Sequence, residues 1–369
     1  MSNKRKISVH IVGTHGVPAC YGGFETLADF LCQHLGSDYD LTVYCNAHKY
    51  PIREKEYYNA KLKYVNIEAN GFKGIFYDLL TYCQALSKAD VILYLSPVGS
   101  GFMTPLKLFT KTKVIVNHGG LNEWEREKLN KLQKIWAKFN HGIAAKYSDI
   151  NIADNFLYRE SLKTHFNADS IIIRYGGDHA HEISVNDSRF CDKYPFIKGQ
   201  YAISVSRAQI DNNIHVVLAA FESFSNYPIV LVSNWNISDY GIKLKEQYKN
   251  HPNMILIDAI YDKDELDYLR SNAYIYIHSH SRCGTAPSLT EAMSIGRPIL
   301  AYDVPTNRET THNKAYYFNS VDNLVSMLGL ISNEQIFDNA LAMKKIATQE
   351  YTWLKIAAQY SEIIDSLVE

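Results

Sequence analysis

The chain alternates short apolar runs with amphipathic segments, a pattern typical of α/β proteins. Runs rich in Val, Ile, Leu and Tyr predict strands, and segments with apolar positions three or four residues apart predict helices. The first half is expected to contain strands Ile7–Gly13, Leu41–Asn46, Val91–Ser96, Val114–Asn117, Asp149–Ala153 and Ile171–Tyr175, and helices Phe24–Leu35 and Glu125–Tyr147. Short loops between strands and helices favour a parallel, doubly wound sheet.

The alternation lapses over residues 184–200 and then resumes. The second half is expected to contain strands Tyr201–Ser206, Ile229–Ser233, Met254–Asp258, Tyr274–His278 and Ile299–Asp303, and helices His215–Phe224, Lys263–Ser271, Pro287–Ile295 and Thr352–Val368. A chain of 369 residues suits two domains better than one. We therefore predict one α/β domain in residues 1–183, a second in 184–350 and a C-terminal helix in 351–369.

Composition narrows the function classes. The 38 basic and 39 acidic residues nearly cancel, which argues against a general nucleic-acid binder. Six scattered cysteines without a C-x-x-C pair favour reduced thiols in a cytosolic protein. The apolar run behind the basic Met1–Lys6 is too short for a signal peptide, and we find no apolar run of the roughly 20 residues that a membrane span needs. A cytoplasmic protein is expected.

The segment 274–303 carries the strongest chemical signal. Its expected strand is followed by a turn with Gly284 and Thr285, and then by a helix that Thr285 or Ser288 could cap. Unpaired amides and the helix dipole favour an anion at such a helix start. Glu291 lies about one turn into the helix and could bind a ribose hydroxyl while the helix start binds phosphate. The combination suggests a nucleotide-diphosphate ligand, although an ordinary strand–turn–helix unit can have the same residues.

This segment also resembles a known family. TAPSLTEAMSIGRPILAYD resembles the nucleotide-sugar motif of the family 4 retaining glycosyltransferases, which have the GT-B fold. VGTHGVPACYGGFET, VNHGGLNEWERE and IIIRYGGDHA resemble a bacterial branch of that family, several members of which are rhamnosyltransferases of capsule and cell-wall polysaccharide synthesis. The resemblance implies two Rossmann-like domains facing across a cleft, a C-terminal helix that crosses back to the first domain, and transfer without a metal or cofactor.

Arg207 follows an expected strand, at the edge where α/β sheets bind ligands, and its planar fork suits phosphate oxygens. By resemblance it binds the donor diphosphate; the alternative is a solvated surface arginine. The family commonly adds a lysine five or six residues later, where this chain has Asn212 and Asn213. We expect Arg282, two residues before Gly284, to supply the missing cation, although a solvated turn arginine is the simpler interpretation.

The family also pairs two glutamates eight residues apart. Glu291 matches the second, but Cys283 occupies the first position, so the amides of Gly284 and Thr285 could take over its contact with the donor sugar. His278, His280 and Cys283 could together suggest zinc. Their spacing fits no common zinc site and the family works without metal, so we predict no metal.

Two features of the first half complete the predicted site. A Gly-rich loop ends in Gly22, Gly23 and Glu25; its spacing does not fit a dinucleotide-binding fingerprint. By resemblance this loop covers the donor phosphates and lines the acceptor side, and Glu25 either contacts an acceptor hydroxyl or merely favours the start of its helix. His118, at a strand end, aligns loosely with a position that touches the donor sugar; a structural role is equally expected.

Helix 125–147 combines apolar and basic side chains. Its apolar stripe is Leu129, Leu132, Ile135, Trp136 and Phe139, beside Lys128, Lys131, Lys134 and Lys138. A basic amphipathic helix can lie on an anionic membrane surface, such as the inner face of the plasma membrane. An ordinary helix with its stripe toward the core is the favoured interpretation.

The sequence therefore predicts a retaining glycosyltransferase. The expected reaction moves rhamnose from dTDP-rhamnose onto a lipid-linked bacterial surface polysaccharide, with Arg207, Glu25 and His118 as candidate catalytic residues. Three alternatives remain open: a glycosyltransferase that uses a UDP-hexose, a nucleotide-sugar epimerase of the same fold, and a sugar-nucleotide-binding protein without turnover.

Overall fold

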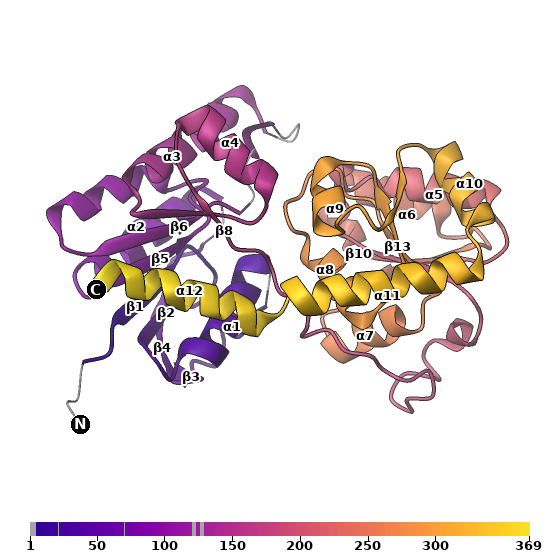
Figure 1. Ribbon diagram of the computed structural model, residues 1–369, viewed down its shortest axis with the longest axis horizontal. Coiled ribbons are helices and arrows are strands. Elements are labelled where there is room, and N and C mark those ends of the chain that lie inside the picture. Colours follow the sequence, from indigo (N-terminus) through magenta and orange to yellow (C-terminus); the bar gives the residue numbers. More distant parts are fainter. Residues whose placement is uncertain (1–4, 21, 70, 120–122, 126–128) are drawn as a thin grey trace. The chain divides into compact units, whose positions relative to one another are not determined.

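The computed structural model describes residues 5–20, 22–69, 71–119, 123–125 and 129–369 (Figure 1). The chain forms two compact units. Unit 1 comprises Met1–Arg174 with Leu354–Glu369, and unit 2 comprises Tyr175–Trp353. The division between them lies before the boundary that the lapse in the sequence pattern predicted at residue 183.

Unit 1 contains a sheet whose described strands run in the order β3-β4-β2-β1-β5-β6-β7-β8. Their bounds are β1 Ser8–Val12, β2 Asp40–Asn46, β3 Glu56–Tyr57, β4 Ala60–Val65, β5 Val91–Leu95, β6 Lys113–Asn117, β7 Ile150–Ala153 and β8 Ile171–Ile172. Neighbouring strands are parallel except for the β3–β4 pair. β1 and β5 are buried along their whole length, as expected for central strands covered on both faces.

Helical segments connect these strands. They are α1 Gly23–Leu35, α2 Gly71–Leu86, η1 Gly101–Phe109, η2 Glu123–Glu125, α3 Lys131–Tyr147 and α4 Phe156–Phe166. α3 begins later than the helix predicted from Glu125, because Asn130 and Gln133 form a capping box that fixes its start. Lys128, which we assigned to that helix, lies outside the described residues.

The C-terminal helix α12 (Trp353–Val368) returns to unit 1, as the resemblance to the GT-B fold implied. Tyr39 donates its hydroxyl to Asp365 Oδ1 at 2.8 Å, and Asn117 Nδ2 donates to the Tyr360 hydroxyl at 2.8 Å. Tyr360 and Ile364 are buried, so both polar and apolar contacts attach the end of the chain to its first unit.

Unit 2 contains a parallel sheet in the order β11-β10-β9-β12-β13-β14. The strands are β9 Ala202–Val205, β10 Ile229–Ser233, β11 Met254–Asp258, β12 Ile275–His278, β13 Ile299–Tyr302 and β14 Tyr316–Phe318. The helical segments are η3 Pro195–Lys198, η4 Ile210–Asn212, α5 Ile214–Ser223, η5 Trp235–Ile237, α6 Asp239–Tyr248, α7 Lys263–Ser271, α8 Pro287–Ile295, α9 Pro305–Thr310, α10 Val321–Leu330 and α11 Asn333–Glu350.

Alternation along the strands of unit 2 divides the apolar residues between two cores. Ile203 and Tyr276 pack in one cluster, while their neighbours Ala202 and Ile275 pack in the other. Successive side chains of a strand point to opposite faces of the sheet. Because both faces are covered, both sets of side chains are apolar, and the strands appear in the sequence as continuous apolar runs. Within the described residues, no helix has both the length and the hydropathy to span a bilayer.

Candidate functional site

Two loops of unit 2 meet at the carboxyl ends of β9 and β12, which are adjacent parallel strands. Ser281 donates to the Asp211 carbonyl through both its amide and its hydroxyl, each at 2.9 Å. Asn213 Nδ2 donates to the Ser279 carbonyl at 3.0 Å. The structure therefore joins the loop that begins at Arg207 to the turn that contains Arg282, at the edge where α/β sheets bind ligands.

Arg207 is exposed and lies near the partly buried His280. Burial lowers the pKa of His280, and the positive charge of Arg207 lowers it further, to about 3. The neighbouring Asn212, where the family that the sequence resembles commonly has lysine, is buried and donates to the Arg207 carbonyl at 2.7 Å. Asn212 thus orders the loop backbone instead of adding a charge to it.

The turn after β12 leads into α8, whose N-cap is Ala286, followed by Pro287. The caps predicted at Thr285 or Ser288 are therefore wrong. Ala286 has no polar side chain, so the N-cap residue offers no acceptor to the first amides of α8. Gly284 and Thr285 are buried just ahead of this helix start, and Arg282 is exposed.

Ser288, in the first turn of α8, lies against the buried Tyr276. Burial raises the pKa of the Tyr276 hydroxyl, while a hydrogen bond with Ser288 opposes that shift. The Tyr276 hydroxyl also donates to the Val205 carbonyl at 3.4 Å. Ser288 therefore helps to connect α8 to the strands beneath the helix start.

Glu291 belongs to a buried ionic network. Its Oε1 atom lies 3.2 Å from Nε2 of His179, and its Oε2 atom accepts from the guanidinium of Arg270. Burial would raise the pKa of Glu291, but Arg270 and the hydrogen bond from His179 lower it to about 2. The side chain is 15% exposed, and a carboxylate has about four acceptor positions, so it can still accept from a ligand hydroxyl.

Two further contacts fix the network in place. Arg270 NH1 lies 3.1 Å from Oδ1 of Asp267, in the same helix. His179 accepts at Nδ1 from the Trp353 indole N–H at 2.9 Å, which leaves its Nε2–H to donate to Glu291. Each member thus has a partner that orients it, and the carboxylate of Glu291 is held in one position.

The sequence patterns did not indicate His179, Asp267 and Arg270 as site residues. The available signal was the Gly-Gly pair in IIIRYGGDHA, just before His179. A Cβ on Gly177 would lie 2.4 Å from the Thr290 carbonyl, so only glycine lets this loop approach α8 so closely. We placed this whole segment in the first domain, whereas in the structure its residues from Tyr175 onward, including His179, belong to unit 2.

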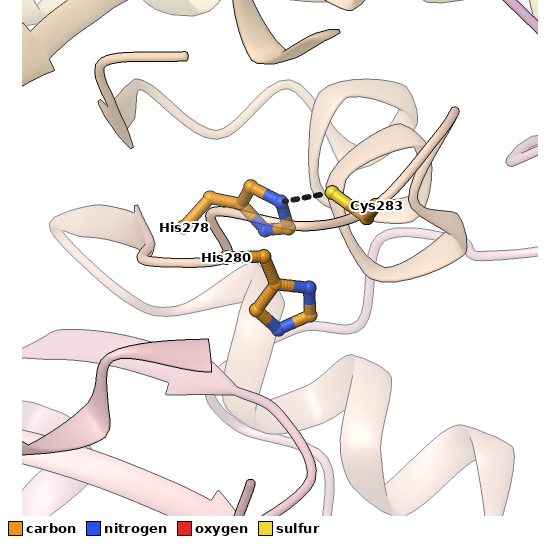
Figure 2. A group of neighbouring side chains, drawn as sticks. All are labelled: His278, His280 and Cys283. Carbon is orange, nitrogen blue, oxygen red and sulfur yellow. Dashed lines mark hydrogen bonds between the residues drawn. The ribbon is translucent and has the colours of Figure 1, made fainter. Parts of the chain in front are cut away.

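Figure 2 shows His278, His280 and Cys283 gathered beside the start of α8. Cys283 Sγ lies 3.9 Å from Nε2 of His278 and 3.7 Å from Oδ1 of Asn307. Burial lowers the pKa of both imidazoles, so they are neutral, as metal ligands must be. Their ligand atoms all lie within 4.8 Å of one another, so this group could supply three of the four ligands that a zinc site needs.

In unit 1, Glu25 orders the Gly-rich loop. Its Oε1 atom accepts from the Thr14 hydroxyl at 2.9 Å and from the His15 amide at 2.8 Å, and only 4% of the residue is exposed. Gly22 is the N-cap of α1, and Gly23 is the first residue of that helix. Glu25 thus has a backbone-binding role in addition to its favourable place near the helix start.

His118 lies inside unit 1 with no exposed surface. Its Nδ1 atom is 3.0 Å from Nδ1 of His141, and its Nε2 atom is 2.8 Å from Oδ1 of Asn151. Burial lowers the pKa of His118 to about 4. Both ring nitrogens have protein partners, so this arrangement gives His118 a structural role and does not support the predicted contact with a donor sugar.

Comparison with known families assigns different matches to the two halves of the chain. Residues 6–178 match the family described as a domain of unknown function (DUF1972). Residues 192–347 match the family described as glycosyl transferases group 1. A search of the curated proteins found no match.

Solved structures share the whole fold at low sequence identity. Sucrose-phosphate synthase from Thermosynechococcus elongatus superposes with a TM-score of 0.82 at 14% identity, over 98% of this chain and 99% of that one. Anabaena Alr3699/HepE in complex with UDP gives 0.76 at 14% identity, over 98% and 100%. The same protein in complex with UDP-glucose gives 0.77 at 13% identity, over 98% and 100%. The predicted GT-B fold class is confirmed. The match of residues 192–347 to glycosyl transferases group 1 supports a nucleotide-sugar glycosyltransferase.

Proposed function

We propose that this glycosyltransferase moves a sugar, with retention of anomeric configuration, from a nucleotide-diphosphate donor to a lipid-linked bacterial surface glycan. The observation that carries the proposal is the convergence in unit 2 of the Arg207 loop, the Arg282 turn and the start of α8, one helical turn from the ionised Glu291. The group 1 match covers these residues. The protein would act in the cytoplasm, at the inner face of the plasma membrane.

Each residue has a role that follows from its charge and position. Arg207 and Arg282 would bind the diphosphate through charge-assisted hydrogen bonds, together with the amides of Gly284 and Thr285. Glu291 would accept from a ribose hydroxyl, as an acceptor that stays ionised at neutral pH. In unit 1, the loop that includes Gly22 and Gly23 would receive the acceptor. Its conformation is maintained by Glu25.

The reaction we propose is a front-face substitution. The bond from the anomeric carbon to the diphosphate oxygen breaks, and a bond to the acceptor hydroxyl oxygen forms on the same face. The acceptor proton passes to the departing phosphate. No divalent metal is assigned, because the arginines and helix amides would stabilise the charge that develops on the leaving group.

The donor we propose is dTDP-rhamnose, on the resemblance of the four sequence blocks to bacterial rhamnosyltransferases. A UDP-hexose is the second candidate, since Alr3699/HepE, which shares the fold, has been solved with UDP and UDP-glucose. Thermal-shift measurements with a donor panel distinguish them, because a ligand that binds only the folded state raises Tm. Stabilisation by UDP-sugars without any by dTDP-rhamnose would reverse the order.

Product analysis tests the reaction itself. The purified protein is incubated with the stabilising donor and a lipid-linked acceptor, and both the glycan and the remaining donor are analysed. A longer glycan with retained configuration supports the transferase. An isomerised donor without transfer would identify an epimerase instead, and donor binding without either product would identify a sugar-nucleotide-binding protein.

A further inference from the structure

Helix α3 exposes the apolar stripe that a core-facing helix would bury. Leu132 is 78% exposed, Ile135 66%, Phe139 49% and Trp136 41%. The buried residues of the helix are instead small or polar: Ala137, Asn140, His141, Ala144 and Ala145. The favoured sequence interpretation, with the stripe toward the core, is therefore wrong.

The face of α3 that packs against η1, called its inner face here, is filled by small and polar residues and not by the apolar stripe. Gly101 of η1 lies so close that a Cβ there would come within 2.2 Å of the Asn140 carbonyl oxygen. Asn140 Oδ1 accepts from the Phe102 amide at 2.9 Å, and its Nδ2 donates to the Trp136 carbonyl at 2.8 Å. This close approach requires small residues on the inner face, which leaves Leu132, Ile135 and Phe139 exposed.

The charges of α3 all have one sign. The helix contains Lys131, Lys134, Lys138 and Lys146 and has neither Asp nor Glu. Two further exposed apolar side chains, Leu108 (64%) and Phe109 (86%), end η1. They follow Lys107, whose Nζ pairs with Asp149 at 2.5 Å, just beyond the C-terminal end of α3. We call Leu132, Ile135, Trp136, Phe139 and the four lysines the α3 surface.

We propose that the α3 surface docks on an anionic lipid bilayer. Exposed Leu, Ile and Phe side chains insert below the headgroups, while lysines contact lipid phosphates. A soluble partner whose contact face is mainly acidic would match the lysines, but it would leave these apolar side chains in water. The inference deepens the proposed function by naming the surface that would reach a lipid-linked acceptor, and it rests on α3 alone.

Trp136 has a place suited to the membrane interface. Its indole N–H donates to the Gly99 carbonyl at 3.2 Å, and its ring packs beside Phe102 and Phe139, with centroids 5.7 and 6.0 Å away. An indole with a satisfied N–H and a partly exposed ring is typical of the headgroup level. It also provides an optical reporter on the proposed surface.

Vesicle co-sedimentation tests the proposal with the full chain. We expect binding to phosphatidylglycerol–phosphatidylcholine vesicles, little binding to pure phosphatidylcholine, and weaker binding at high salt. The triple variant Leu132→Ser, Ile135→Ser, Phe139→Ser should reduce partitioning about tenfold or more, since each apolar side chain contributes on the order of 1 kcal/mol or more. The matched control Phe337→Ser, Leu341→Ser removes exposed apolar side chains of α11, which are 63% and 54% exposed, and should bind like the wild type.

Charge reversal provides a second, independent test. Lys131→Glu, Lys134→Glu, Lys138→Glu should abolish the preference for anionic vesicles. Reversing the exposed Lys198, Lys243 and Lys345 of unit 2 changes net charge equally and should leave that preference intact. Wild-type binding by the α3 variants, or no binding by the wild type, would overturn the proposal.

Trp136 fluorescence locates the contact. The other tryptophans, Trp124, Trp235 and Trp353, are 7%, 0% and 2% exposed, so lipids with brominated acyl chains should quench mainly Trp136. Equal quenching in Trp136→Phe would place the bilayer elsewhere. Sedimentation velocity without lipid tests whether a second copy of the chain binds the α3 surface instead. A dimer that the triple serine variant abolishes would identify this surface as a self-association face and contradict the proposal.

The outcomes also separate this inference from the proposed reaction. If vesicle binding fails while the protein still glycosylates a short water-soluble acceptor, the docking surface is wrong and the transferase stands. If the protein binds vesicles through α3 and yields no glycan with any donor, the docking surface stands and the transferase is wrong.

Discussion

The side chains of His179 and Glu291 meet across 112 residues of sequence, with Nε2 of the imidazole 3.2 Å from Oε1 of the carboxylate. Arg270 binds the other carboxylate oxygen, and Trp353 orients the imidazole. The acidic residue that the sequence motif emphasises is therefore bound by two residues, His179 and Arg270, that the motif does not contain. A ligand hydroxyl that binds Glu291 would meet an acceptor already fixed in charge and direction.

Glu291→Gln should weaken donor binding and lower turnover. A neutral amide is a poorer acceptor than a carboxylate, and loss of a hydrogen bond to a charged group costs about 1.5–3 kcal/mol. Calorimetry with the nucleotide diphosphate measures the loss after circular dichroism has confirmed folding, since the variant also removes one of the two carboxylates that pair with Arg270. Glu334→Gln, in the first turn of α11, is the control. Unchanged affinity in folded Glu291→Gln would show that Glu291 serves only the buried network.

Gly177→Ala should destabilise unit 2, because the added Cβ would lie 2.4 Å from the backbone carbonyl of Thr290. Forcing extra volume into such a packed contact costs about 1–3 kcal/mol. Gly329→Ala is a matched control in α10, where a Cβ meets nothing within 4 Å. There alanine should stabilise by about 0.5–1 kcal/mol, since glycine is a poor helix residue. Denaturant midpoints shifted in the same direction by both variants would contradict this packing argument.

The predicted elements of segment 274–303 match the structure closely, because local signals fix them. Pro287 begins α8 and Gly296, with a φ of 79°, ends it, so the helix matches its predicted bounds. Arg207 and Arg282 could be assigned to one edge of the sheet from strand alternation alone, because carboxyl ends of parallel strands share that edge.

Other features depend on contacts that no local pattern encodes. His118 follows a strand, as predicted, but its partners His141 and Asn151 come from α3 and β7, and they turn the ring inward. α3 has a regular apolar stripe, yet the glycine contact with η1 selects the opposite face for burial. In both cases periodicity indicates an element, and tertiary packing decides which side of it is buried.

Acidification should destabilise the fold between about pH 6.5 and pH 4. Burial lowers the pKa of His118 to about 4, below its value in the unfolded chain. Between these pH values the unfolded state therefore binds more protons than the folded state. The contribution of the neutral His118 to the free energy of unfolding is present above pH 6.5 and is lost as the pH falls below 6.5. One such histidine contributes on the order of 2 kcal/mol between pH 7 and pH 5. Denaturant unfolding at both pH values measures this loss; His118→Gln should lose less stability than the wild type.

Transfer should persist when divalent metals are removed. The charge on the leaving group would be offset by arginine side chains and helix amides, and metal is not required for that role. Activity is measured before and after chelation, in the wild type and in Cys283→Ser, which lacks the thiol of the His278–His280–Cys283 group. If chelation abolishes wild-type activity and zinc restores it, but zinc fails to do so in Cys283→Ser, this group is a functional metal site and the prediction is wrong.

Arg282→Ala should selectively weaken binding of the diphosphate. The turn that contains Arg282 is attached to the Arg207 loop by hydrogen bonds from Ser281 to the Asp211 carbonyl, so both arginines lie on two joined loops at the edge of the sheet. The buried Asn212, which adds no charge, occupies a position where the family that the sequence resembles commonly has lysine. A second cation would therefore have to come from elsewhere in these two loops, and Arg282 is exposed in the turn after β12.

The readout compares ligands that differ only in phosphate. Affinity for the nucleotide diphosphate should fall about tenfold in Arg282→Ala, about 1.4 kcal/mol, while affinity for the nucleoside should hardly change. Arg282→Lys should recover only part of the loss if the contact is bidentate, because an ammonium is a point charge. Arg159→Ala removes an exposed arginine of unit 1 and controls for net charge. Equal loss for nucleoside and diphosphate would indicate a distorted turn, and wild-type diphosphate affinity would show that Arg282 is an ordinary surface residue.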